Sequence, residues 1–287
     1  MSWVTIDQEK CTTCGICVLR CPRCFSLKDE KVSVQADEKC CIVCGHCVSL
    51  CPADAITHHR MDMNNFEPVG TPVQFPSDAF MRFIRERRSH RQFKKKEVAK
   101  TTIQQLIEAA RYAPTGSNVQ SVEIIVLETD DRKKRLSDLT IDFFVEMGAN
   151  AAETLKSMPA GPATPARLLV EKLVRYRENM LQAKSVGYDP IFHHAPVVLM
   201  FHSLLETSTP KDNCVIASTT VGLFARTLGL ECTYIGLLEI AARSYPPLAE
   251  AIGLPEGHQI QSVLIVGYPK LKYLRLVDRN RIRVRWE

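Results

Sequence analysis

Short apolar runs and amphipathic periodicities divide most of this 287-residue chain into strands and helices. Runs rich in β-branched residues predict buried strands. These strands are expected at 122–127, 196–201, 231–235 and 260–267. Apolar residues three and four positions apart predict helices at 79–87, 103–112, 133–155, 166–183 and 214–228. The larger, C-terminal part of the chain is therefore expected to combine helices with a buried sheet.

Two further segments predict strands of another kind. Residues 281–286 alternate arginines with Ile282, Val284 and Trp286, a pattern typical of a half-buried strand that joins a sheet edge. Near the N-terminus, residues 31–35 alternate in the same way, and residues 53–56 are expected to lead into the strand that pairs with them.

A proline-marked segment separates two domains. Residues 61–76 contain Pro68, Pro72 and Pro76 with Gly70, which is typical of an extended linker. The sequence therefore predicts a small domain at 1–60, a linker at 61–76 and a second domain at 77–287. The chain is long enough for this second domain to have a sizeable core.

The composition is that of a folded protein, with 45% hydrophobic and 24% charged residues. The first residues lack the basic start and apolar run of an export signal, and no stretch has the twenty or so apolar residues that a membrane span needs. We therefore expect a cytoplasmic protein without a membrane partner, in a reducing and anaerobic cell.

The net charge of +5 is concentrated downstream of residue 60, where 85–96 and 270–287 are rich in Lys and Arg. Basic segments of this kind bind either nucleic acid or a phosphate group. Aromatic residues are not interleaved with these charges as a base-stacking surface requires. We expect a phosphate ligand and no nucleic-acid partner.

Ten of the twelve cysteines lie between residues 11 and 51. Eight of them form two copies of the pattern C-x2-C-x2-C-x3-C-P, thirty residues apart. This spacing brings three thiolates close enough to bind three irons of one cubane cluster. Zinc sites usually pair two separated CxxC units, and a disulfide framework does not need this exact spacing, so both are less favoured.

The repeat resembles bacterial ferredoxins with two [4Fe-4S] clusters, and the resemblance covers residues 1–60. It implies that the fourth cysteine of each motif binds the other cluster. One cluster would be bound by Cys11, Cys14, Cys17 and Cys51, and the other by Cys41, Cys44, Cys47 and Cys21. Cys24 and Cys40 fit neither set and are expected to be small residues that are buried or partly buried. His46, His58 and His59 are expected near the surface or beside the ligands, and not as ligands.

Motifs in the second domain occur in the order found in the FMN-dependent nitroreductase family. They are RRSHRQF at 87–93, APTGSNVQ at 113–120, APV at 195–197, LGLECTYIG at 228–236 and VGYP at 266–269. Each motif alone is weak, but together they resemble this family over residues 77–287. The resemblance implies an α+β fold, with a mixed sheet flanked by helices, in a homodimer that binds FMN at the subunit interface.

The same resemblance assigns roles to individual residues. Arg87, Arg88 and Ser89 would contact the phosphate and ribityl chain of FMN, and guanidinium groups suit phosphate oxygens because their planar donors match them. Arg91 would face N1 and O2 of the flavin and stabilise negative charge on the reduced ring.

Further contacts are implied from three other segments. A loop that approaches the flavin from the partner subunit would contain Pro114, Thr115, Gly116 and Asn118. The backbone near flavin N5 and O4 would be that of Ile235, Gly236 and Leu237. Arg279, with Arg281 behind it, would complete the phosphate site. The strand at 281–286 would join the partner subunit, with the edge of its own sheet as the alternative.

These features predict a ferredoxin-coupled flavin reductase. Electrons from an external donor such as a reduced ferredoxin, with NAD(P)H as an alternative, would pass through the clusters to FMN. The acceptor would be a small molecule such as a nitro compound, a quinone or an activated double bond. Two alternatives remain: a dehydrogenase that exports electrons through the clusters, and a non-catalytic redox sensor or electron carrier. No catalytic residue is assigned; Tyr188, His193 and His194 are expected to be polar surface residues.

Overall fold

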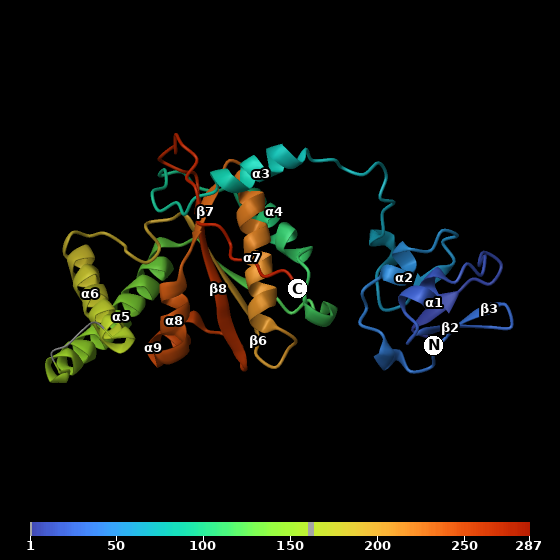
Figure 1. Ribbon diagram of the computed structural model, residues 1–287, viewed down its shortest axis with the longest axis horizontal. Helices are drawn as coiled ribbons and strands as arrows, with labels where there is room; N and C mark the ends of the chain where they lie inside the picture. Colours follow the sequence, from blue (N-terminus) through green and yellow to red (C-terminus); the bar gives the residue numbers. More distant parts are fainter. Residues whose placement is uncertain (1, 160–163) are drawn as a thin grey trace. The chain divides into compact units, whose positions relative to one another are not determined.

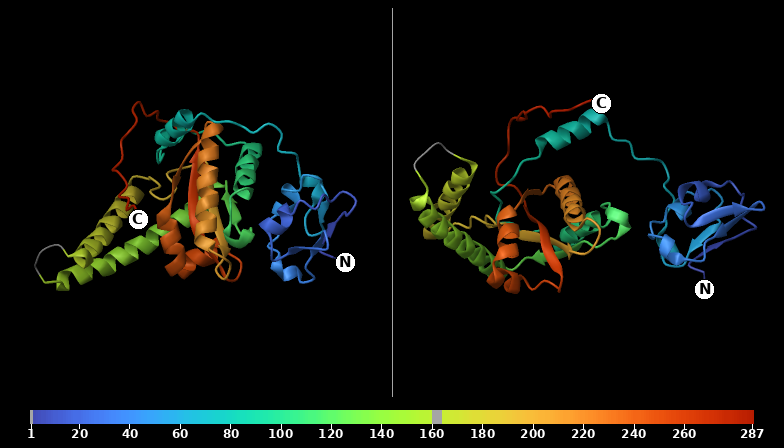
Figure 2. Two further views of the ribbon diagram at one scale, coloured as in Figure 1. Left: turned by 45° about the vertical axis from the view of Figure 1, so that its right-hand side comes forward. Right: turned by 60° about the horizontal axis from the view of Figure 1, so that its bottom comes forward.

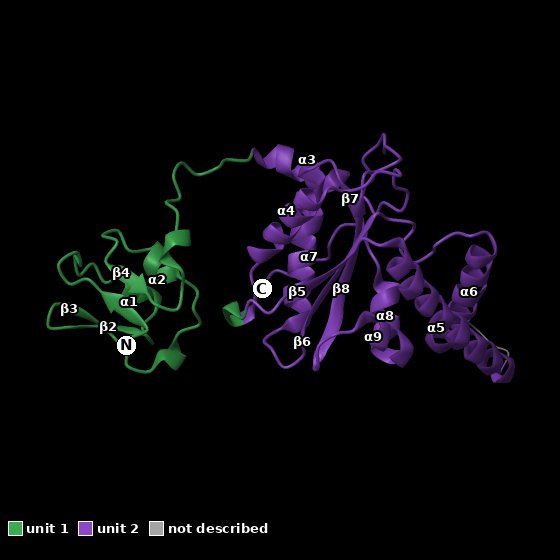
Figure 3. Cartoon of the chain, turned by 180° about the vertical axis from the view of Figure 1, so that it is seen from behind, with its two compact units in different colours: residues 1–75, 117–119 green, residues 76–116, 120–287 purple. Residues whose placement is uncertain are grey.

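The computed structural model describes residues 2–159 and 164–287, and it divides into two compact units (Figure 3). The first unit comprises Met1–Phe75 and Ser117–Val119, and the second comprises Pro76–Gly116 and Gln120–Glu287. Part of the segment expected as a linker packs in the first unit, because Met63 and Phe66 lie against its hydrophobic core.

The first unit is built from very short elements. In chain order they are β1 (Val4–Ile6), α1 (Ile16–Arg20), β2 (Phe25–Lys28), β3 (Lys31–Val34), η1 (Glu38–Cys40), α2 (His46–Ser49), β4 (Ile56–His58) and η2 (Met63–Asn65). Two antiparallel pairs form, β1 with β4 and β2 with β3. The core contains Trp3, Phe25 and Ile56 together with several cysteines, so it has little apolar mass of its own.

The pairing predicted for residues 31–35 is wrong. We expected 53–56 to lead into their partner strand, but β3 forms a hairpin with β2, and β4 pairs with β1. The reason is local: Asp29 and Glu30 both have positive φ (49° and 58°), the conformation of a tight two-residue hairpin turn. This short connection fixes the partner of β3.

The second unit contains a four-stranded sheet in the order β5-β6-β8-β7. The strands are β5 (Glu123–Leu127), β6 (Val197–Leu204), β7 (Glu231–Tyr234) and β8 (His258–Gly267). The central strands β6 and β8 are buried almost throughout, as their apolar runs predict. All three pairings are antiparallel. The mixed sheet that was expected requires at least one parallel pair. A strand that forms such a pair would have to come from outside these four strands.

Helices cover both faces of this sheet (Figure 1). Their bounds are α3 (Ser77–Glu86), α4 (Lys100–Arg111), η3 (Gly116–Asn118), α5 (Asp130–Ser157), α6 (Pro165–Ser185), α7 (Pro210–Thr227), α8 (Gly236–Ser244) and α9 (Pro246–Ile252). Helices α4 and α7 pack on one face, and α5, α8 and α9 pack on the other. The predicted α+β class is confirmed. Helices α8 and α9 were missed, because Gly236 and the Pro246-Pro247 pair interrupt the periodicity there.

The long helices α5 and α6 lie side by side and extend away from the sheet (Figure 2). Gly148 permits this packing: a Cβ there would lie 2.4 Å from the Cβ of Arg177 and 2.8 Å from the carbonyl oxygen of Leu173. In the described ranges no helix is long and apolar enough to cross a membrane.

The strand predicted at 281–286 does not form within this chain. Residues 270–287 contain no helix or strand, and Ile282 and Trp286 are 88% and 91% exposed. The alternative of an edge strand in its own sheet is therefore wrong. An alternating strand is stable only where an edge and an apolar surface receive it.

Candidate functional site

Four cysteines of the first unit surround one cavity. Its lining includes Cys11, Cys14 and Cys17 from the loop around the start of α1, and Cys51 from the end of the second motif. The chain thus brings three thiols of one motif together with the fourth thiol of the other. Four converging thiols are the donor set of an iron–sulfur or zinc site.

The two cysteine loops share one unusual backbone conformation. Thr13 and Val43 both have φ of 54°, and Gly15 and Gly45 have φ of 71° and 72°. For the β-branched Val43 this conformation is strained. Left-handed residues in such a loop turn backbone N–H groups inward, as in anion-binding nests. Val43 N accordingly donates to Cys41 Sγ at 3.3 Å.

Three cysteines of the second motif also lie together. Burial raises the pKa of Cys47 to about 11, and the neighbouring thiols of Cys41 and Cys44 act in the same direction. Cys21, the expected fourth member, lies against Cys24, whose thiol also contacts Cys40. Burial and these two contacts raise the pKa of Cys24. Cys24 is buried as expected, and the assignment of Cys21 stays a prediction.

His58 is fully buried beside the second set, on β4. Its Nδ1 accepts a hydrogen bond from Arg60 N at 3.3 Å, so the proton is on Nε2. Nε2 lies 3.4 Å from Cys41 Sγ and donates to it. Burial lowers the pKa of His58, which keeps the ring neutral. His58 and His59 were both expected near the surface or beside the ligands, and the structure places His58 against Cys41.

In the second unit, Arg226 positions the arginine-rich turn after α3. Its guanidinium group lies over the ring of Phe83, 4.4 Å from the centroid, and bonds to the Phe83 carbonyl and to Glu86. Nε of Arg226 also donates to Glu231 at 3.0 Å. The turn itself is fixed to β7, because His90 N donates to the carbonyl of Cys232 at 3.2 Å. Arg226 was not predicted as part of the site.

Arg88 has unused donors in this turn. Its Nη1 donates to the carbonyls of Arg85 and Arg87, at 2.7 and 2.8 Å. Its Nε and Nη2 are buried and have no hydrogen-bond partner within the described residues. Buried charged donors without partners are costly. Two donors on one face of a guanidinium group fit an anion with several oxygens, such as a phosphate.

The backbone at the start of α8 is accessible. Ile235 N is held by the carbonyl of Val263 at 2.9 Å, and Gly236 follows as the first helical residue. Gly236 is exposed, and a Cβ added there would meet no atom within 4 Å. Leu237 is half-buried. A flat ring could therefore approach this backbone closely, next to the N–H groups at a helix N-terminus.

The first part of the loop at 113–120, up to Gly116, lies elsewhere on the second unit. Gly116 N donates to Oδ1 of the buried Asn213 at 2.9 Å, and Thr209 Oγ1 donates to the same oxygen at 3.0 Å. A Cβ at residue 116 would lie 2.4 Å from Thr209 Oγ1 and 2.8 Å from Ser208 Oγ, so any larger residue would require these side chains to move. Asn213 is at the start of α7 and Arg226 is at its end, about 20 Å apart at 1.5 Å per residue. The loop and the arginine turn are thus at opposite ends of one helix.

The remaining predicted residues are not gathered at these points. Pro114 is exposed, and Thr115 Oγ1 accepts from Gln120 N at 3.1 Å. Asn118, which groups with the first unit, donates to the carbonyls of Ile42 and Val43 at 3.1 and 2.9 Å. Ser89, Arg279 and Arg281 are exposed.

A tyrosine–histidine pair lies near Arg91. Tyr188 Oη and His193 Nδ1 are 2.6 Å apart. Burial lowers the pKa of His193 to about 4, and the Arg91 cation acts in the same direction. Burial also raises the pKa of Tyr188, so the phenol keeps its proton and donates to a neutral imidazole. His193 and His194 both have positive φ (53° and 54°), a strained arrangement that is frequent at functional sites.

These observations define a two-part protein: one unit has four cysteines around a cavity, and the α+β unit has an arginine-rich turn in which two buried donors lack a partner among the described residues. The sequence matches the nitroreductase family over residues 84–268 and the 4Fe-4S binding domain over residues 4–23. The chain belongs to the nitroreductase family, as the motifs predicted, and carries an N-terminal 4Fe-4S binding motif. This family consists of oxidoreductases.

Relatives and solved structures agree with this assignment. A 4-nitrobenzoate reductase of Nocardioides sp. (strain LMS-CY) is 26% identical over 211 residues, which are 67% of this chain and 81% of that protein. An NADPH-dependent oxidoreductase of Staphylococcus haemolyticus (strain JCSC1435) is 24% identical over 190 residues, 62% of this chain and 66% of that protein.

Among solved structures, a nitroreductase with bound FMN from Bacteroides fragilis NCTC 9343 has a TM-score of 0.55 at 18% identity, covering 72% of this chain and 98% of its own. A BluB-like flavoprotein from Clostridium difficile 630 has a TM-score of 0.53 at 20% identity, covering 70% and 94%. These likenesses establish the fold.

Proposed function

We propose that this protein is an FMN-dependent reductase that receives electrons through two [4Fe-4S] clusters and reduces a small organic acceptor. The observation that carries the proposal is the presence, in one chain of nitroreductase fold, of four cysteines around one cavity and of two buried guanidinium nitrogens of Arg88 without partners among the described residues. The cysteine-rich unit is suited to one-electron transfer, and the nitroreductase-fold unit is suited to binding a flavin.

For the clusters, the ligand sets are Cys11, Cys14, Cys17 and Cys51, and Cys41, Cys44, Cys47 and Cys21. The cavity lined by the first set supports the crossed pattern, because Cys51 comes from the other motif. The matching backbone of the two loops supports a second cluster of the same kind. N–H donors to Cys41 and Cys51, from Val43 and Ala55 at 3.3 Å each, would stabilise charge on the coordinating sulfurs.

For FMN, the residues that would bind it fit the group. The free Nε and Nη2 of Arg88 would donate to the phosphate, with Arg87 and Ser89 beside it. The open surface at Gly236 would receive the ring. Bound FMN would supply the exchange between one-electron transfer from the clusters and two-electron reduction of the acceptor.

The site is completed by a second copy of the chain. Within one chain, the loop held by Asn213 and the turn held by Arg226 are at opposite ends of α7, so the loop can reach a flavin at the turn only from a partner. Exposed apolar residues also favour a homodimer: Met81 and Ile84 on α3, and Trp286 in the C-terminal segment. The tail would pair with the partner's sheet.

The chain's own groups would bind the acceptor and provide protons. Arg91 would stabilise negative charge that develops on the flavin and the acceptor. The Tyr188–His193 pair, near Arg91, holds one proton on the phenol and one on the imidazole Nε2. This pair would orient the acceptor and protonate it as it is reduced.

The test is an anaerobic preparation of the whole protein, with iron, sulfide and FMN measured per chain. A reduced ferredoxin is then added, and cluster bleaching and flavin reduction are followed in the visible spectrum, with 4-nitrobenzoate as the acceptor. We expect the clusters to bleach first, then the flavin, and then turnover. A flavin that stays oxidised while the clusters are reduced would overturn the proposal. NADPH in place of ferredoxin, at equal or higher rate, would overturn the proposed donor.

A further inference from the structure

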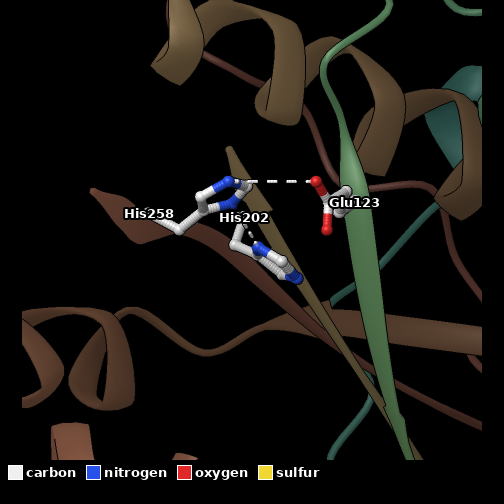
Figure 4. Close-up of side chains that lie close together, drawn as sticks. All are labelled: Glu123, His202 and His258. Atoms are coloured by element: carbon white, nitrogen blue, oxygen red, sulfur yellow. Dashed lines mark hydrogen bonds and ion pairs between the residues drawn. The ribbon is translucent and has the colours of Figure 1, made fainter. Parts of the chain in front are cut away.

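Three neighbouring strands bring a carboxylate and two imidazoles together at one end of the sheet (Figure 4). Glu123 is the first residue of β5, His202 is near the end of β6, and His258 is the first residue of β8. Glu123 is directly opposite His202 in the β5–β6 pair. A register shift between Phe201 and His202 brings His202 opposite Ile260, diagonal to His258. The cluster is thus built by strand pairing, from three separate parts of the sequence.

The three residues lie close enough together for one ion, although their two direct contacts use different nitrogens of His258. His202 Nδ1 and His258 Nδ1 are 3.0 Å apart, and His258 Nε2 is 3.9 Å from Glu123 Oε1. One ligand atom from each residue lies within 4.8 Å of the others. Two imidazole nitrogens bound to one tetrahedral zinc at about 2.0–2.1 Å would be roughly 3.3 Å apart. Small side-chain rotations would therefore suffice for coordination.

The burial of the three residues is graded. His202 is buried, at 3% exposure, and the side chains of His258 and Glu123 are 13% and 57% exposed. The floor of the cluster is therefore fixed, while the carboxylate side is open to solvent. An ion could enter from that side, and water could complete its coordination.

The cluster is separate from the arginine turn of its own chain. It lies at the end of β6 and the start of β8, whereas the arginine turn contacts the other end of both strands, where Lys94 N donates to the carbonyl of Tyr268. The ten residues of β8 span about 30 Å between these ends. Neither the cysteine motifs nor the arginine turn includes any of these three residues.

We propose that Glu123, His202 and His258 bind one divalent zinc ion, with solvent at the remaining position. Two imidazole nitrogens and one carboxylate oxygen form a donor set that suits zinc. The ion would cross-link β5, β6 and β8 where the sheet begins. The simpler interpretation is a hydrogen bond between the two histidines with Glu123 nearby, and the two interpretations predict different results on exposure to zinc.

The experiment uses the full-length protein with clusters and FMN loaded. It is equilibrated anaerobically with micromolar zinc, desalted, and assayed for zinc, iron and sulfide per chain. The zinc K-edge absorption spectrum then identifies the ligands, because nitrogen and oxygen bind at about 2.0–2.1 Å and cysteine sulfur at about 2.3 Å. We expect one zinc per chain with a nitrogen and oxygen shell. A sulfur shell, or no retained zinc, would overturn the proposal.

Variants locate the site. His258→Gln should weaken zinc binding about a hundredfold and Glu123→Gln about tenfold, while His59→Gln, at another histidine outside the cluster, should bind like the wild type. Unchanged iron, sulfide and FMN contents show that each variant is folded. Because Glu123 is exposed, its variant gives an answer even if His258→Gln does not fold. Wild-type affinity in Glu123→Gln and in any folded His258→Gln would assign the zinc elsewhere and reject the proposal.

Discussion

The two candidate cofactor regions of this molecule are assembled in different ways. In the first unit, three thiols around the cavity come from seven consecutive residues, and only Cys51 is distant in sequence. In the second unit, the arginine turn, the start of α8 and the loop at 113–120 come from separate segments, and two of them lie at opposite ends of α7. A metal-cluster site can thus be encoded locally, whereas a flavin site depends on the whole sheet and, as we propose, on a second chain.

The largest effect is expected at Cys51, the one ligand of the first cluster that is distant in sequence. Cys51→Ser should abolish the cluster of the first motif, although Cys51 belongs to the second, so iron and sulfide per chain should fall by about half. Cys24→Ala, at a cysteine outside both sets, is the control and should keep both clusters. Cys44→Ser should lose only the cluster of the second motif and so identifies which cluster is which. If Cys51→Ser loses the same cluster as Cys44→Ser, the crossed assignment is contradicted.

In the second unit, the largest single effect is expected at Arg88. Arg88→Ala removes the two buried donors that await a phosphate, and charge-assisted hydrogen bonds of this kind contribute about 1.5–3 kcal/mol. FMN should bind roughly 10- to 150-fold more weakly, measured by flavin fluorescence. Lys95→Ala, on the exposed chain after the turn, should leave the affinity unchanged. Equal affinities in the two variants would place the phosphate elsewhere.

The dependence on a second chain can be tested by mixing variants. Asn213→Ala releases the loop at 113–120, and Arg88→Ala disables the turn. If each site combines the turn of one chain with the loop of its partner, a mixed dimer of the two variants contains one intact site. Co-expressed chains with different tags should then regain up to about half of the wild-type FMN content. If turn and loop of one chain form the site, no activity or FMN is regained.

A smaller effect is expected at the acceptor side. Tyr188→Phe removes the hydroxyl that donates to His193 Nδ1, and turnover of 4-nitrobenzoate should fall about tenfold at unchanged FMN content, since solvent can still supply a proton. The exposed Tyr112→Phe is the matched control. Because burial lowers the pKa of His193 to about 4, the imidazole is neutral above that value, and the wild-type rate should show no His193 transition between about pH 5 and 8.

The smallest effect is expected at His58, which contacts Cys41 in the second cysteine loop. His58 donates to Cys41 Sγ, and this bond stabilises the additional negative charge of a reduced cluster. His58→Leu should therefore lower the potential of that cluster by roughly 30–60 mV, the equivalent of about 1 kcal/mol for one electron. His59→Gln should not change it. A shift in the other cluster alone, followed by redox titration, would contradict the contact.

Much of the fold could be predicted from local pattern. The strands β5, β6 and β8 and the helices α5, α6 and α7 lie close to their expected positions, because apolar periodicity indicates which residues face a core, although β5 is only partly buried. The errors concern which strands pair with one another, which the apolar pattern does not specify. Residues 281–286 alternate like a strand but have no edge to join within this chain, and the partner of β3 was decided by a two-residue turn.

The sequence by itself determined which kind of site each unit is expected to contain. Cysteine spacing indicates a cluster because three ligands of one cubane can come from seven consecutive residues, and the motif order indicates the nitroreductase family. Only the tertiary structure decided which side chains meet. It revealed the unsatisfied donors of Arg88, the contact of His58 with Cys41, and the grouping of Glu123, His202 and His258. Strand pairing and helix packing bring together residues that are far apart in the chain, and no local spacing records those distances.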